Sequence, residues 1–353
     1  MQILVQKVVM WKVVLSVLVV SMLSAGCEPP AGRDRPVTIA GTTFPDTTGE
    51  RHWLGFAEQL EASTDLNLRL LIYGQLGSED QLVSGLRRGR VQFANLSAMA
   101  VSTVVPEMAL LYAPFLFDNE AESDFVYDNY LTPLYREMLA AKGLHLVSWY
   151  EIGFVQIYGK EPLLQPEDAH GLRFRVGAGP AARGFAKAIG ADVIPLGFAD
   201  VVSSLQTGLI EAGENSVSLY ARTGIAGEAS QLTLTNHSFG VSAIVASKVW
   251  WDSLTAAQQA AVTAAWPAAQ RVRADVRAES AADLAAGDEL GITVHRITAA
   301  ERDRWRAAAA PVTGQLIKTI GGRSAEIHAV IQQGRTAFAE LDYIYADIRT
   351  ALR

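Results

Sequence analysis

An arginine and an asparagine on neighbouring predicted strands could together bind a small anion. Residues 172–176 alternate apolar and basic types, as a strand with one solvated face does, and Arg175 lies near its end. Residues 210–216 form the second predicted strand and carry Asn215. A planar guanidinium matches a carboxylate, which it holds through two N–H groups. The spacing alone also fits a simpler interpretation, in which Arg175 forms an exposed salt bridge on a surface strand.

Other residue types that support catalysis or bind metals do not assemble into a site. The six histidines show no metal-type spacing, and Cys27 is the only cysteine. Residues 177–184 are rich in glycine, but Ala182 stands where a dinucleotide fingerprint needs its third glycine. Glu214 could serve as a general base, but no nucleophile accompanies it and no Gly-x-Ser-x-Gly elbow is present. We therefore expect no enzyme active site, no metal site and no cofactor site.

The first 26 residues have the composition of a secretory signal peptide. Two lysines precede an apolar run at residues 13–23, which ends in small residues before Cys27. The run is shorter than the roughly 20 residues that a membrane span needs. The segment ending at Cys27 resembles the bacterial lipobox, although Ser24 replaces the usual leucine. We expect lipidation of Cys27, with simple cleavage as the alternative, and a proline-rich tether over residues 27–36.

Charge and length limit the class of protein further. The formal net charge is −7, and because residues 1–26 carry two lysines and no acidic residue, the remainder carries −9. No basic run suggests a nucleic-acid partner. No second apolar run approaches membrane length, so the mature chain is expected to be soluble or tethered. The chain is longer than one hydrophobic core usually serves, which favours two lobes.

Alternating strands and helices predict an α/β fold. Such alternation is typical of a parallel sheet that is covered by helices on both faces. Two strand pairs, 144–150 with 154–158 and 232–236 with 241–246, lie where the chain would cross between lobes. Pro267 should kink or break the helical segment 253–290, and residues 298–353 are mainly helical. The other predicted strands are 37–44, 67–73, 91–96, 172–176, 192–195, 210–215 and 292–296.

Several short motifs, each present once, follow one another over residues 37–338 in an order found in a known family. Together they resemble the solute-binding proteins of TRAP (tripartite ATP-independent periplasmic) transporters, and the resemblance does not cover the last residues of the chain. The motifs are Gly74-Gln-Leu-Gly-Ser-Glu79, Pro114-Phe-Leu-Phe117, Gly171-Leu-Arg-Phe-Arg-Val176, Leu205-Gln-Thr-Gly208, Glu214-Asn215, Leu232-Thr-Leu-Thr-Asn-His237 and Ser247-Lys-Val-Trp-Trp-Asp-Ser-Leu254.

The resemblance implies roles for individual residues. In that family an arginine at the end of such a strand forms a salt bridge with the substrate carboxylate, and its position here is that of Arg175. The family's cleft asparagine falls on Asn215, and the aromatic residue that packs on the ligand falls on Phe198. Glu214 is included in the predicted site, where it would brace Arg175 or face solvent.

The sequence departs from the family pattern where the chain would enter the second lobe. Family members commonly read Gly-Phe-Arg-Gln there, whereas this chain has Val155 in place of the arginine, followed by Gln156. A valine cannot hold a carboxylate, so the site would use one arginine, or Gln156 would reach in with a neutral amide. It should then suit a monocarboxylate or a ligand whose far end is uncharged or apolar. Trp149 and Tyr150 would line that end or pack in the core.

Three residues of the first lobe complete the predicted site. Thr43 and Phe44 follow the first strand, and Ser97 follows the third. Binding sites gather at the carboxyl ends of parallel strands, which favours contact with the ligand at these positions. Ser97 could equally cap a helix.

The resemblance predicts a two-lobed α/β fold of the periplasmic-binding-protein type, with a ligand cleft between the lobes and long C-terminal helices. Lobe I would comprise residues 37–150 and 238–280, and lobe II residues 151–237 and 281–353. Exported to the periplasm or cell envelope, the protein would capture a small organic carboxylate and deliver it to the permease subunits of an ion-gradient-driven TRAP transporter. A ligand sensor that docks to a receptor or kinase without transport is the alternative.

Overall fold

The computed structural model describes residues 36–177 and 179–351, with side chains as far as residue 341. Within it, residues from Val37 onward form one compact unit. The predicted signal peptide and Cys27 lie outside the described residues. No helix in the described part of the chain combines the length and apolar character that crossing a membrane requires.

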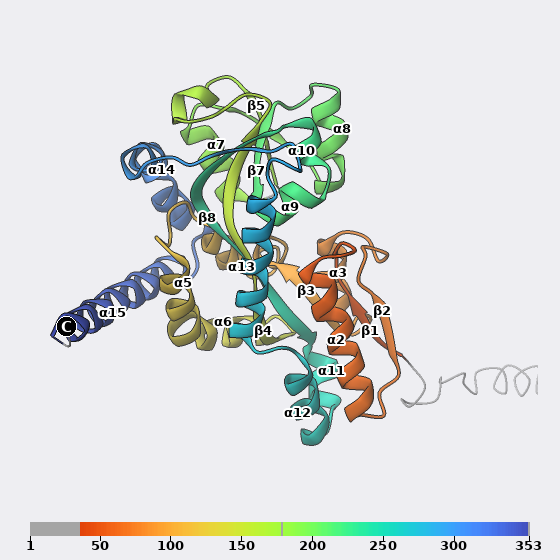
Figure 1. Ribbon diagram of the computed structural model, residues 1–353. Coiled ribbons are helices and arrows are strands. Elements are labelled where there is room, and N and C mark those ends of the chain that lie inside the picture. The colour runs from red at the N-terminus through yellow and green to blue at the C-terminus, as the bar shows by residue number, and fades with distance from the viewer. Residues whose placement is uncertain (1–35, 178, 352–353) are drawn as a thin grey trace, which may run out of the picture. The chain divides into compact units, whose positions relative to one another are not determined.

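Nine strands form one mixed sheet (Figure 1). They are β1 (Val37–Ala40), β2 (Leu68–Leu71), β3 (Phe93–Ser97), β4 (Leu144–Gly159), β5 (Arg173–Val176), β6 (Asp192–Pro195), β7 (Ala212–Ser216), β8 (Gln231–Ser247) and β9 (Thr293–His295). Their order is β2-β1-β3-β8-β4-β7-β5-β6, and β9 pairs with β8. The pairs of β1 with β2 and β3, and of β5 with β6 and β7, are parallel, as predicted. At the centre, for which no pairing direction was predicted, β4 and β8 pair antiparallel with each other, β8 pairs antiparallel with β3, and β4 pairs antiparallel with β7.

The two central strands pass without interruption from one end of the sheet to the other. The sequence predicted two strands in place of β4, with Gly153 in the gap between them, and two in place of β8, the first of which was expected to end at Asn236. In the structure these residues have positive φ angles of 92° and 47°, and each strand continues through them. Shifts of register, including one between Glu151 and Gly153, absorb the local bends. Each expected crossing is therefore one long, bent strand.

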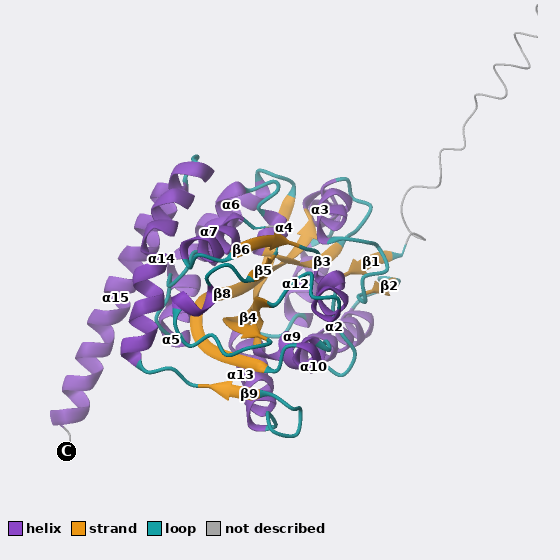
Figure 2. Ribbon diagram, turned by 90° about the horizontal axis from the view of Figure 1, so that it is seen from above, coloured by secondary structure: helices purple, strands orange, loops and turns teal. Residues whose placement is uncertain are grey.

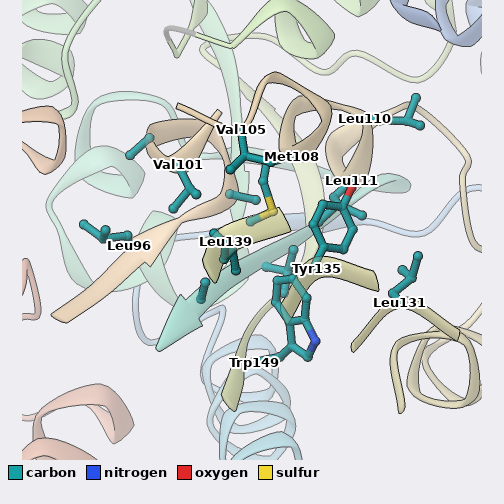
Figure 3. Packing of buried hydrophobic residues seen from close by; sticks show 14 of the residues in the cluster. Leu96, Val101, Val105, Met108, Leu110, Leu111, Leu131, Tyr135, Leu139 and Trp149 are labelled. Carbon is teal, nitrogen blue, oxygen red and sulfur yellow. The ribbon is translucent and has the colours of Figure 1, made fainter. Parts of the chain in front are cut away.

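Helices cover both faces of the sheet around β1 to β3. Aromatic residues of α2, among them Trp53 and Phe56, pack on one face with Phe93 and with Trp266, which follows α12. The opposite face packs against α3, α4, η1 and α6. Figure 3 shows residues of α4, η1 and α6 in this cluster. These elements are α2 (Thr48–Ser63), α3 (Glu79–Arg87), α4 (Ala98–Val101), η1 (Pro106–Tyr112), α5 (Glu120–Val126), η2 (Tyr127–Leu131), α6 (Thr132–Ala140), α11 (Lys248–Ser253) and α12 (Ala256–Ala265).

The sheet around β5 to β7 is also covered on both faces. Phe174 and Val176 of β5 pack against α7 and α14, whereas Tyr158 of β4 faces α8, α9 and α10. Two long helices end the chain and lie beside each other in Figure 2. These elements are η3 (Pro166–Ala169), α7 (Pro180–Ala188), η4 (Phe198–Asp200), α8 (Val201–Gln206), α9 (Val217–Arg222), α10 (Ile225–Glu228), α14 (Ala299–Ile320) and α15 (Ser324–Ala351).

The helix α13 (Ala269–Ala285) contacts elements from both ends of the sheet. Pro267 separates it from α12, which confirms the predicted break. The Glu279 carboxylate accepts hydrogen bonds from the backbone N and Oγ1 of Thr48, at 2.7 and 3.0 Å, at the start of α2. Asp283 accepts two hydrogen bonds from Arg222 of α9, at 2.7 and 3.0 Å. The helix thus ties α2 to α9 through charged side chains.

Candidate functional site

Arg175 is a buried cation without an anionic partner in the described part of the protein. Its residue surface is 8% exposed, because β5 lies inside the sheet with Phe174 and Val176 in the core. Nε and Nη2 donate to the carbonyl oxygen of Leu196, at 3.3 and 3.0 Å, and no described carboxylate forms an ion pair with the guanidinium. Because a buried charge without a counter-ion is unfavourable, this arrangement favours an incoming anion.

The neighbouring Arg173 fits the simpler interpretation. Its side chain is 45% exposed and forms a salt bridge with Glu211 at 3.0 Å. Its Nε also donates to the carbonyl oxygen of Gly208 at 3.1 Å. Two arginines on one strand therefore have different environments, and the exposed surface salt bridge belongs to Arg173 and not to Arg175.

One half-buried aromatic ring lies beside Arg175, and a second half-buried ring lies beside the first. The guanidinium carbon is 6.0 Å from the ring centroid of Phe198, at the start of η4, which is within the range of a cation–π interaction. The ring of Phe44, in the loop after β1, lies 5.8 Å from that of Phe198. The structure thus brings together one residue from the β1 end of the sheet and two from the β5 end, as the sequence predicted.

Two hydroxyl groups converge at the start of α2. A Cβ atom on Gly49 would lie 2.8 Å from Oγ1 of Thr43 and 3.4 Å from Oη of Tyr150, so only glycine fits there without displacing them. The ring of Tyr150 packs near His52, with 5.9 Å between the ring centroids. Burial raises the pKa of Tyr150, which keeps its hydroxyl neutral. Thr43 and Tyr150 therefore form a neutral polar group near Phe44.

Strand register places Asn215 on the same face of the sheet as Arg175. Arg175 pairs with Gly213, two residues before Asn215 on β7, and alternate residues of a strand share a face. The Oδ1 atom of Asn215 accepts a hydrogen bond from the backbone N of Ser216 at 2.9 Å. Its amide N–H groups donate to no described residue and can therefore meet a ligand.

Met99 belongs to this region and was missed in the sequence. A Cβ atom on Gly177, just beyond β5, would lie 3.1 Å from Cε of Met99 and 4.0 Å from Nη2 of Arg175. Gly179 leaves room for the same methionine, whose sulfur a Cβ there would meet. The glycines at 177 and 179 were the available signal, but a methionine in a short apolar helix suggests core packing.

Gln156 and Glu214 have protein partners. The side-chain amide of Gln156 forms two hydrogen bonds with Asn236. Its Nε2 donates to Oδ1 of Asn236 at 2.6 Å, and its Oε1 accepts from the backbone N of Asn236 at 2.9 Å. It thereby supports the bend of β8 at Asn236. Glu214 bonds Nε2 of His237 at 2.8 Å and is 13% exposed. The expectation that Glu214 braces Arg175 or faces solvent is wrong, because its strand position directs it to the opposite face.

Trp149 packs in the core. It is 6% exposed, and its Nε1 donates to Oγ1 of Thr132 at 2.9 Å. Its ring lies edge-on to those of Tyr127 and Tyr135, with centroid distances of 5.2 and 5.6 Å. Figure 3 shows Trp149 beside Tyr135. Of the two alternatives left open for Trp149, the structure supports core packing. Tyr150, the next residue, points to the other face of β4.

Ser97 caps a helix. Its Oγ accepts a hydrogen bond from the backbone N of Ala100 at 3.1 Å, in the first turn of α4. Its backbone N and its Oγ both donate to the carboxylate of Glu79, each at 2.7 Å. Burial raises the pKa of Glu79, and the hydrogen bonds from Ser97 oppose that rise. The capping alternative therefore describes Ser97 in this structure.

A mixed sheet with two parallel ends and two long connecting strands is the architecture of a two-lobed α/β protein, and Arg175 is buried in it without an ion-pair partner among the described residues. Residues 40–319 match the family described as bacterial extracellular solute-binding protein, family 7, and the chain belongs to this family. This confirms the predicted membership among TRAP solute-binding proteins. Members of this family are solute-binding proteins that work with membrane permeases.

Individual relatives agree with this assignment. A solute-binding protein of Verminephrobacter eiseniae is 30% identical over 278 residues, covering 77% of this chain and 82% of the relative. The ectoine/5-hydroxyectoine-binding periplasmic protein of Ruegeria pomeroyi is 28% identical over 282 residues, with coverages of 77% and 82%. The solved sugar acid binding protein of Advenella mimigardefordensis, in complex with galactonate, has a TM-score of 0.79 and 26% identity, covering 85% of this chain and 98% of that one.

Proposed function

We propose that the protein captures a small organic carboxylate through Arg175 and delivers it to the permease subunits of a TRAP transporter. The observation that carries this proposal is the pairing state of Arg175. The guanidinium is 8% exposed, bonds a carbonyl oxygen and has no carboxylate partner among the described residues. A ligand carboxylate would supply the missing charge.

The neighbouring residues would orient and cover the ligand. Asn215 would donate its free amide N–H groups to the carboxylate or to a polar substituent beside it. Phe198 and Phe44, whose rings are 5.8 Å apart, would pack against the ligand body. Because these walls exclude water, the ion pair with Arg175 would strengthen once the ligand is enclosed. Charge-assisted hydrogen bonds of this kind are about twice as strong as neutral ones.

The composition of the site favours a ligand with a single carboxylate. Met99, Phe44 and Phe198 are apolar, while Thr43 and Tyr150 offer neutral hydroxyl groups. Val155, which is 7% exposed, stands where relatives commonly carry a second arginine. Hydroxyl-bearing monocarboxylates such as sugar acids match this set of groups, and galactonate is the ligand of one solved relative.

Export and lobe organisation complete the proposal. We infer that residues 1–26 direct export to the periplasm and that Cys27 becomes lipidated, since it follows an apolar run and small residues. The proposed lobes are residues 37–150 with 238–280, and residues 151–237 with 281–353. Mass spectrometry of the exported protein tests the anchor, because a mature chain that begins elsewhere than at Cys27 would contradict it.

A thermal-melt screen tests the proposed ligand class. A soluble form of residues 28–353, which leaves out the proposed lipid-bearing Cys27, would be heated with galactonate, galacturonate, glucuronate, lactate, benzoate and succinate, and with the matched amides. A ligand at about 100 times its Kd stabilises the folded state by about 2.7 kcal/mol, which gives a clear shift of Tm. We expect shifts from acids that their amides do not produce. Shifts from neutral compounds only would contradict the proposal and favour a binding protein of another specificity.

A further inference from the structure

Tyr158 buries a hydroxyl group that has no hydrogen-bond partner. The residue lies on β4 and is 0% exposed, and its Oη is bonded to no atom of the described residues. A buried hydroxyl without a partner costs about 1–3 kcal/mol, so folded proteins rarely keep one without a reason. The groups around this hydroxyl therefore indicate what could act as its acceptor.

The hydroxyl lies on the face of the sheet that carries Arg175. Tyr158 pairs with Gly213, and Gly213 pairs with Arg175, so the three residues form one row across β4, β7 and β5. The tip of the Tyr158 side chain occupies the space where a Cβ atom of Gly213 would stand. Burial raises the pKa of Tyr158, whereas the nearby charge of Arg175 acts in the opposite direction. The unpartnered hydroxyl and the unpaired guanidinium are therefore neighbours.

Tyr220 shows that the fold can satisfy a tyrosine hydroxyl in this core. Its ring stacks on that of Tyr158, with centroids 5.7 Å apart and planes inclined by 22°. The Oη of Tyr220 donates to the carbonyl oxygen of Ala229 at 2.7 Å. Of these two stacked tyrosines, Tyr220 has an acceptor for its hydroxyl, whereas Tyr158 has none among the described residues.

The other unpartnered buried side-chain atoms of the described residues do not share this row. Each lies at a sheet position or on an element that has no register pairing with Arg175. They are Nδ1 of His52, Oδ1 of Asn95, Oη of Tyr127, Oγ of Ser247 and Nε1 of Trp266.

We propose that the Tyr158 hydroxyl is a second hydrogen-bond donor to the carboxylate that Arg175 binds, and so a further specificity-determining residue. The proposal rests on the proposed function of Arg175. An O–H group and a guanidinium can both donate to a carboxylate, which accepts at two oxygens. A neutral amide offers a single oxygen acceptor and an NH2 group that cannot accept from either donor. The pair would therefore favour acids over their amides.

Two single-atom variants test this inference, with Tyr158→Phe as the variant and Tyr220→Phe as its matched control. The probe is the acid of the panel above that gives the largest melting shift. In Tyr158→Phe we expect affinity for that acid to fall by about tenfold or more, since a hydrogen bond to a charged group is lost. The Tm of the ligand-free protein should stay the same or rise. In Tyr220→Phe the Tm should fall and affinity should stay unchanged.

Arg175→Gln separates failure of this inference from failure of the proposed function. If Tyr158→Phe binds the acid as tightly as the parent while Arg175→Gln does not, the Tyr158 hydroxyl is no ligand donor and the role of Arg175 stands. If Arg175→Gln also binds with parental affinity, the proposed function itself is wrong. A lower Tm for ligand-free Tyr158→Phe would show that the hydroxyl has a structural partner, which also contradicts the inference.

Discussion

Arg175 on β5 and Arg273 on α13 are equally buried but differ in pairing. Arg273 has a side chain that is 9% exposed and forms ion pairs with Asp128 at 2.7 Å and with Asp124 at 3.1 Å. Arg175 is 8% exposed and bonds the carbonyl oxygen of Leu196. Arg277, which lies one turn after Arg273 on α13, also forms ion pairs, with Asp124 and with Glu151.

This difference in ion pairing indicates different roles for the arginines on α13 and for Arg175. The α13 arginines hold α5 and β4 against α13, and the fold supplies their counter-ions. At β5 the fold buries the same group with no counter-ion among the described residues, and in the proposed function the ligand supplies it. Binding sites commonly retain such unfavourable arrangements at the expense of stability. The comparison therefore predicts opposite consequences when the two kinds of arginine are replaced.

Arg277→Ala should produce the largest loss of stability. Glu151 is 3% exposed at its side chain, and Arg277 donates to both of its oxygens, at 3.0 and 2.6 Å. Removing one partner of a buried ion pair typically costs about 3–5 kcal/mol, and partial exposure of Arg277 favours the lower figure. Urea unfolding measures the effect. Arg271→Ala, which breaks an exposed pair with Asp275, is the control and should unfold close to the parent.

The loss in Arg277→Ala should depend on pH. Burial raises the pKa of Glu151 above its ordinary value, while Arg277 opposes that rise. Without Arg277 the pKa of Glu151 in the folded state rises further, so the folded state binds a proton more tightly than the unfolded state. The deficit should therefore be small below pH 4.5, the ordinary value for Glu151, and grow as the pH rises to neutral. A deficit that is equal at pH 4.5 and 7.5 would contradict this assignment.

Arg273→Ala should have a smaller effect. Its partners Asp124 and Asp128 have side chains that are 26% and 37% exposed, so water can solvate them once the arginine is gone. Loss of hydrogen bonds to charged groups then amounts to about 2 kcal/mol. Urea unfolding of Arg273→Ala and Arg277→Ala under the same conditions shows which variant loses more free energy of unfolding. A larger loss in Arg273→Ala would show that burial of the carboxylate does not control the effect.

Arg175→Gln should have the smallest effect on the stability of the ligand-free protein. The variant removes a buried charge that has no counter-ion among the described residues, and it keeps a donor for Leu196. We expect a free energy of unfolding within about 0.5 kcal/mol of the parent, or above it. A loss comparable to that of Arg277→Ala would show that Arg175 is a structural residue, and the comparison between the two regions would fail.

Local sequence patterns predicted much of the fold, but they did not predict strand pairing or ion pairs between residues far apart in the chain. Alternating strands and helices, and the break at Pro267, follow from neighbouring residues and are confirmed. The continuous paths of β4 and β8 were not predicted, because Gly153 and Asn236 resemble strand ends until a partner strand continues through them. The partners of Arg273 lie about 145 residues away in the chain, and nothing local identifies them.

The candidate site was predictable where a residue type carries a specific chemistry. Arg175 was identified by its residue type and its place near a strand end, Phe198 through the family resemblance, and Phe44 through its place after the first strand. Tyr158 and Met99 were missed because both stand in apolar runs that suggest core packing. Trp149 and Tyr150 must face opposite sides of β4, but the sequence does not say which side faces the site. Only the sheet assigns Trp149 to the core.

Isothermal titration of Arg175→Gln against Arg173→Gln tests the central claim most directly. Both variants neutralise an arginine on β5, but Arg173 is exposed and paired with Glu211. With the acid that the parent binds, we expect Arg173→Gln to keep parental affinity and Arg175→Gln to lose at least about a hundredfold, as expected when a buried charge-assisted contact is removed. Parental affinity in Arg175→Gln would show that the unpaired guanidinium does not hold the ligand.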